Sequence, residues 1–146
     1  MLYSRHITIP ANTLEANASK TYVKVNRGWI YRIWVTFPAG CRGLVKLRIY
    51  HEGHPFLPIE KDAYLNGNDI TFDFPVYFPI RDEPQILTIE VWNDDDTHSH
   101  SIQILILILP KQFIMPVGAV EGIMESLKSL ILHPIIIKQE AEAVAE

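Results

Sequence analysis

The chain has 146 residues, is 48% hydrophobic and carries a formal net charge of −4 without any Lys/Arg block, which argues for one domain and against nucleic acid as a partner. Its single cysteine, Cys41, excludes an internal disulfide, and residues 1–6 lack the apolar core and cleavage site of a signal peptide. Because no stretch approaches the roughly 20 apolar residues of a membrane span, we expect synthesis in the cytoplasm and no membrane partner.

Turn residues divide the first part of the chain into short runs of alternating apolar residues. This alternation predicts β-strands at residues 3–9, 20–25, 29–37 and 44–50. The apolar residues of the fourth strand are expected to face the core, and its expected partner is the third strand. The third strand is expected to divide its side chains between two faces: Trp29, Tyr31, Ile33, Val35 and Phe37 on one, and Ile30, Arg32, Trp34 and Thr36 on the other.

Prolines interrupt the middle of the chain. Residues 51–67 contain two prolines and are expected to be mostly loop, with a short edge strand at residues 56–57. Brief strands are then expected at 68–74 and 76–78, because Pro75 cannot donate a hydrogen bond within a sheet.

Two further strands are predicted before Pro110. Residues 85–92 alternate, and an acidic turn leads from them into the run 98–109, so we expect these two strands to form a hairpin. About eight strands without helical periodicity predict an all-β antiparallel sandwich, and a jelly roll of two four-stranded sheets fits the length. A closed eight-stranded barrel fits nearly as well. We expect the β-sandwich domain at residues 1–110 and a helical arm at 111–146.

The last predicted strand is apolar on both faces. Its isoleucines at even positions from 102 to 108 and its leucines at odd positions from 105 to 109 point in opposite directions. The core covers one face, and the other face needs a helix, a second sheet or another subunit. This pattern favours a protein that functions by assembly.

The arm is predicted to contain an amphipathic helix at residues 118–133, because its apolar residues recur every three or four positions. Pro134 ends it, and a short β-like run follows at 135–137. Burial of the helix's apolar face is worth on the order of 10 kcal/mol, so it is expected to dock on its own sandwich or on a neighbouring subunit. A membrane-surface helix is less favoured because the polar face is not basic. The residues expected at subunit interfaces are Ile104, Ile106, Ile108, Val120, Ile123, Met124, Leu127, Leu130, Ile131, Ile135, Ile136 and Ile137.

Histidines are the only candidate metal ligands. His98 and His100 lie two apart on a predicted strand, whereas His51 and His54 lie in a loop. A cupin is also a jelly roll and binds a transition metal with a His-x-His pair, a nearby Glu and a later His. Here the pair lies on the final strand and no Glu follows closely. We therefore favour a polar rim beside the acidic turn, and expect no cofactor.

The sequence matches no other catalytic motif. The chain has no Gly-x-Ser-x-Gly motif, no phosphate loop and no paired cysteines. Arg42 could lower the pKa of Cys41, but a small buried side chain in a turn is the favoured interpretation. An enzyme is therefore not expected. Arg32, Trp34 and Tyr50 are the residues that could stack on a carbohydrate or receptor ligand.

Four segments resemble the small jelly-roll virion proteins of bacterial and archaeal tailed viruses. They are residues 6–13 (HITIPANT), 28–33 (GWIYRI), 37–45 (FPAGCRGLV) and 92–98 (WNDDDTH), and the likeness covers about residues 5–109. In that family similar modules sit on or between capsomers, often as trimers, and clamp the shell. The resemblance implies a capsid decoration or cement protein in the virion, with copies of itself and the major capsid protein as partners.

The expected function is therefore non-enzymatic assembly of a viral shell. Abundant isoleucine and sparse glutamine are typical of a hot environment, which indicates a thermophilic virus. A carbohydrate- or receptor-binding β-sandwich is the first alternative, and a cupin-like metalloprotein is the second.

Overall fold

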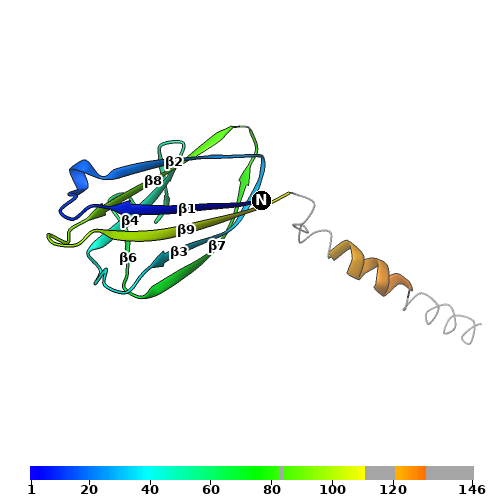
Figure 1. Cartoon of the computed structure of the whole chain (residues 1–146). Helices are drawn as coiled ribbons and strands as arrows, with labels where there is room; N and C mark the ends of the chain where they lie inside the picture. Colours follow the sequence, from blue (N-terminus) through cyan, green and yellow to red (C-terminus); the bar gives the residue numbers. More distant parts are fainter. Residues whose placement is uncertain (83, 111–120, 131–146) are drawn as a thin grey trace, which may run out of the picture. The chain divides into compact units, whose positions relative to one another are not determined.

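The computed structural model describes residues 1–82, 84–110 and 121–130 (Figure 1). It divides into one unit over residues 1–111 and another over 112–146, and each is described by itself. The described part of the first unit contains these elements: β1 (Leu2–Ile9), the short 3-10 helix η1 (Glu15–Asn17), β2 (Ser19–Val25), β3 (Gly28–Phe37), β4 (Val45–His51), β5 (His54–Leu57), β6 (Leu65–Asn66), β7 (Ile70–Ile80), β8 (Gln85–Asn93) and β9 (His100–Leu109).

The strands form two antiparallel sheets packed face to face as a sandwich. Sheet A has four strands in the order β1-β9-β3-β7, and sheet B has the order β2-β8-β4-β5 with β6 also paired to β4. Apart from β6, the strands pair from the two ends of the chain inward: β1 with β9, β2 with β8, β3 with β7, and β4 with β5. This roll-up is that of a jelly roll, so the predicted fold class is confirmed, and the closed barrel is not formed.

Two expected strand pairings are wrong. β3 and β4 do not pair with each other, and neither do β8 and β9, because each of these connections crosses from one sheet to the other. β4 pairs instead with β8, and β9 lies between β1 and β3. A short turn between two alternating runs fits a hairpin and a crossing between sheets equally well, so the local sequence could not distinguish them.

A β-bulge changes the faces of β3. The register slips between Ile30 and Arg32, which leaves Tyr31 as an extra residue relative to β9. Ile30 therefore lies in the core with Ile33, and Trp29 points outward, opposite to the expectation.

β7 is one continuous strand of 11 residues that includes both Pro75 and Pro79, where two shorter strands were expected. It can include them because it is the edge of sheet A. A proline on an edge strand can turn its missing N–H side toward solvent, so no ladder hydrogen bond is lost.

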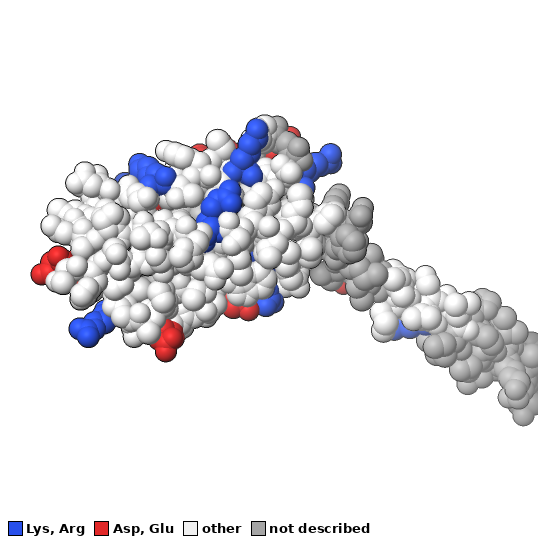
Figure 2. All heavy atoms as spheres, in the orientation of Figure 1, with Lys and Arg blue, Asp and Glu red and all other residues white. Residues whose placement is uncertain are grey.

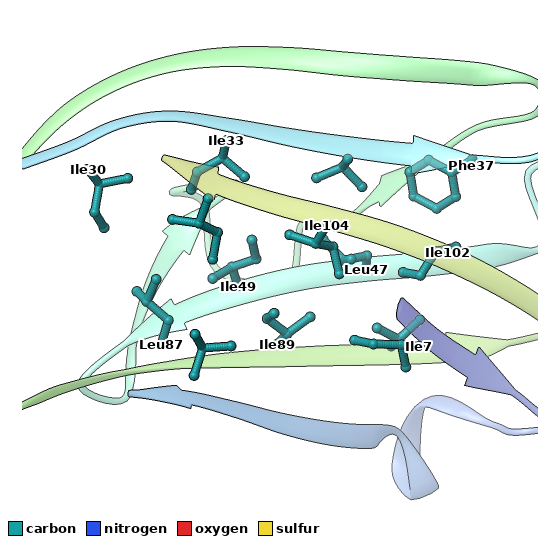
Figure 3. Packing of buried hydrophobic residues seen from close by; sticks show 14 of the residues in the cluster. Ile7, Ile30, Ile33, Phe37, Leu47, Ile49, Leu87, Ile89, Ile102 and Ile104 are labelled. Atoms are coloured by element: carbon teal, nitrogen blue, oxygen red, sulfur yellow. The ribbon is translucent and has the colours of Figure 1, made fainter. Parts of the chain in front are cut away.

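Isoleucine, leucine and valine side chains from both sheets fill the interior (Figure 3). The expected inward residues of β4 and β8 are confirmed, and Cys41 is also buried. Burial raises the pKa of the Cys41 thiol, which disfavours its reactive thiolate form. The core of the sandwich includes Ile7, Ile9, Val23, Val25, Ile30, Ile33, Val35, Phe37, Val45, Leu47, Ile49, Leu87, Ile89, Val91, Ile102, Ile104, Ile106 and Ile108.

In the second unit, residues 121–130 are helical and all ten are exposed. They fall within the helix expected at 118–133. The remaining parts of that helix and the β-like run at 135–137 lie outside the described residues. Within the described parts of the chain, no helix is long and apolar enough to cross a membrane.

Candidate interaction surface

The outer face of sheet A changes character halfway along its strands. On β9 the outward residues are Ser101 and Gln103 at the start of the strand and Leu105, Leu107 and Leu109 toward its end. The polar residues lie beside polar residues of the neighbouring strands: Gln103 pairs with His6 on β1 and Thr36 on β3. One half of this face is therefore polar on every strand that crosses it.

The other half is mainly apolar, although Ser4 lies opposite Leu105 on β1. Leu107 pairs with Leu2 on β1, Leu105 with Trp34 on β3, and Leu109 with Trp29 on β3. We call these six residues the leucine–tryptophan patch. Leu2 is 60% exposed, and the other five are half-buried. In Figure 2, one short row of Lys and Arg side chains crosses a sandwich surface that otherwise carries few charges.

Arg32 lies within this apolar half, opposite Leu107. Its Nη1 donates a hydrogen bond of 2.9 Å to Asp73 on β7, and its guanidinium lies 5.7 Å from the centroid of the Tyr31 ring. Its Nε is buried and has no hydrogen-bond partner.

The outer face of sheet B differs because its charges are neutralised within the chain. Glu90 is only 8% exposed and accepts hydrogen bonds from Arg48 Nε at 2.7 Å and from Lys20 at 3.1 Å. Burial of the Glu90 carboxyl opposes its ionisation, but these two cations outweigh burial and hold its pKa below the usual range. Arg48 also lies over Trp92, 5.1 Å from the ring centroid. Tyr22, 64% exposed, and Ile86, 41% exposed, are large hydrophobic side chains on the same face.

The four histidines do not come together. His51 ends β4, where the neighbouring strand residue is Leu87, whereas His98 and His100 follow the other end of β8. The strand from Leu87 to Asn93, which separates His51 from His98 and His100, is roughly 20 Å long. His100 donates through Nε2 to Asp95 at 2.8 Å if that nitrogen is protonated, and among the described residues no His, Cys, Asp or Glu cluster could hold a metal ion. The cupin-like arrangement is therefore not formed by these residues.

The expected ligand face is divided between the two sheets. Arg32 and Trp34 lie outward on sheet A, but Tyr50 lies outward on sheet B, where the guanidinium of Arg48 is 5.6 Å from its ring centroid. The three residues therefore cannot contact one small ligand together. β3 and β4, which carry these residues, belong to different sheets, so the residues do not form one continuous surface.

The residues expected at subunit interfaces fall into three groups: core residues, exposed helix residues, and residues outside the described parts of the chain. Ile104, Ile106 and Ile108 are at most 1% exposed and belong to the core, so the outward face of β9 is the leucine face instead. The helix residues Ile123, Met124, Leu127 and Leu130 are 51%, 52%, 48% and 72% exposed. The others lie outside the described residues: Val120, Ile131, Ile135, Ile136 and Ile137.

Comparisons with protein-family models, with curated proteins and with solved structures find no match for this chain. The strand topology alone therefore defines the fold class. The change from Ser and Gln to Leu along β9 is visible in the sequence, but the patch is not, because the register of β1 and β3 against β9 is needed to recognise it.

Proposed function

We propose that this chain is a non-enzymatic structural protein that assembles with copies of itself and decorates or cements a viral shell. The leucine–tryptophan patch carries this proposal. Trp, Tyr and Arg are the residues that dominate the centres of protein interfaces, and the patch contains two tryptophans, with Arg32 and Tyr31 beside it. The resemblance of the four segments to small virion proteins is the reason for proposing a viral shell as the structure on which the protein assembles.

Burial is the proposed mechanism. A rigid β-sandwich that docks through an apolar surface removes that surface from water, and each docked copy favours the assembled state over its separate parts. With few charges beside the patch, we expect the association to depend weakly on salt.

The oligomeric state tests the self-assembly part. Light scattering after size-exclusion chromatography is expected to give a multiple of the 16.8 kDa chain mass, with a trimer favoured. Leu107→Lys should reduce that mass, because it places a charge in the patch, whereas Gln103→Lys on the polar half of the same strand face should not. A protein that is monomeric at every concentration would overturn the proposal.

The shell part has a separate test. In a culture that produces the encoding virus, the protein is expected in purified particles by mass spectrometry, and washing particles free of it should lower the temperature at which the shell opens. Its absence from purified particles would contradict this part of the proposal.

A further inference from the structure

The leucine–tryptophan patch is too small to hold two sandwiches together. With strands about 4.8 Å apart and about 3.4 Å per residue, three strands and the five positions from Leu105 to Leu109 cover on the order of 200 Å². A stable interface uses roughly 800 Å² on each partner. The occupant of the patch is therefore expected to be smaller than a domain or to make additional contacts elsewhere.

The helical segment of the arm has the complementary properties. Ile123, Met124, Leu127 and Leu130 form one apolar stripe, and each is about half exposed or more. The ten described residues of the helix measure roughly 15 Å, which is close to the span of the patch. A surface that covers this stripe would remove its apolar side chains from water.

The helix is polar outside this stripe. At 100° per residue, Ser126 and Lys128 flank the apolar stripe, and Glu121 and Glu125 lie farther round the helix. The helix therefore offers an apolar stripe to a surface that presents apolar side chains.

We propose that the leucine–tryptophan patch binds the helical segment of a second copy of this chain, residues 121–130. This inference rests on the proposed self-assembly and identifies its contact. Because the donor helix and the acceptor patch are different surfaces, the contact is heterologous and closes into a ring when each copy donates to the next. A ring of three copies leaves every patch and every helix occupied.

Disulfide trapping between two single variants tests this contact. Leu107→Cys and Leu127→Cys chains are mixed, allowed to exchange subunits and mildly oxidised. A covalent dimer is expected in the mixture and in neither variant alone. Gln103→Cys mixed with Leu127→Cys is the matched control, because residue 103 shares the strand face but lies on its polar half. Cys41 can stay in place because it is buried.

Each outcome decides the question. Equal trapping at positions 103 and 107 would overturn the inference, and so would a Leu107→Cys/Leu127→Cys double variant that links only within one chain. Leu105→Cys repeats the test, and circular dichroism checks that each variant is folded. Light scattering on the same samples separates the two proposals: an oligomer without preferential trapping refutes only this contact, whereas a monomer refutes self-assembly as well.

Discussion

At the scale of single residues, the carboxylate of Asp95 organises the connection between β8 and β9. Its Oδ1 accepts hydrogen bonds from the backbone N–H groups of Thr97 at 2.9 Å and His98 at 3.0 Å, and its Oδ2 is 2.8 Å from Nε2 of His100. The hydrogen bond from Thr97, followed by those from His100 and His98, holds the pKa of Asp95 well below its usual range. One side chain thus fixes a crossing between the two sheets.

This depressed pKa predicts a loss of stability in acid. Because the pKa of Asp95 is lower in the folded chain than in the unfolded chain, its stabilising effect is complete above the ordinary carboxyl pKa of about 4 and is lost as the pH falls below it. Asp95→Asn should therefore be less stable than the natural chain at pH 7 and should lose less stability between pH 5 and pH 2, measured by urea unfolding. Asp96→Asn, at the exposed neighbouring position, is the control. An unchanged pH profile in Asp95→Asn would contradict this role.

Gly28 is a second residue on which the fold depends. Its φ is +153°, and a Cβ at this position would lie 2.8 Å from both Cγ2 of Ile108 and the backbone oxygen of Leu109. Gly28→Ala should cost about 1–3 kcal/mol, because β9 would have to move away from β3. Gly53→Ala is the matched control, since its φ of +81° is also positive but no atom lies within 4 Å. Thermal unfolding should show the larger loss at Gly28, and equal losses would mean that contact with β9 is unimportant.

At the scale of elements, β9 has two apolar faces with different roles. Its isoleucines are at most 1% exposed and pack in the core, whereas its leucines are half-buried on the outer face of sheet A. Alternation of side chains on a strand separates the two sets completely, so one element can serve folding and association. In contrast to β9, β7 lies at the edge of sheet A, and its prolines make this edge unsuited to pairing with another strand.

Substitutions on the two faces of β9 should therefore differ in their dependence on protein concentration. Ile104→Ala is expected to cost about 2–5 kcal/mol at any concentration, because it leaves a cavity in the core. Leu105→Ala should cost about 1 kcal/mol in dilute solution and more at high concentration, where association stabilises the natural chain. Urea unfolding at two protein concentrations distinguishes them. A loss for Leu105→Ala that is independent of concentration would argue against an interface at this face.

At the scale of the whole molecule, the core and the arm are separate in the sequence. Every buried hydrophobic residue of the described chain lies between Ile7 and Ile108. The first described residue of the helical segment, Glu121, comes after them all. Among the described residues, the buried hydrophobic side chains therefore all belong to the sandwich.

Removal of residues 111–146 should leave a folded protein. The truncated chain of residues 1–110 is expected to unfold cooperatively, with the midpoint of the full chain in dilute solution, because every buried hydrophobic residue of the described chain is retained. It should also lose self-association, measured by light scattering, because the proposed donor helix is gone. A truncated chain that is unfolded or precipitates would show that the arm is part of the core. A truncated chain that still assembles would place the interface wholly on the sandwich.

The amino-acid sequence by itself determined most of the strands, the inward residues of β4 and β8, and the helical segment. Alternation along residues 44–50 and 85–92 and the three-to-four spacing near residue 127 are properties of neighbouring residues, and local backbone geometry translates them directly into elements. The spacing of the strands was also enough to indicate a jelly roll, because few architectures accommodate so many short strands.

Only the tertiary structure decided which strands pair and therefore which side chains meet. The crossing of β8 to β9, the bulge at Tyr31 and the gathering of the leucine–tryptophan patch all depend on contacts between residues far apart in the chain. Alternating runs satisfy many pairings and registers equally well, and a shift of one residue reverses a face. Burial of the whole core selects among them, so Ile30 turned inward, Tyr50 was separated from Trp34, and the histidines were placed at opposite ends.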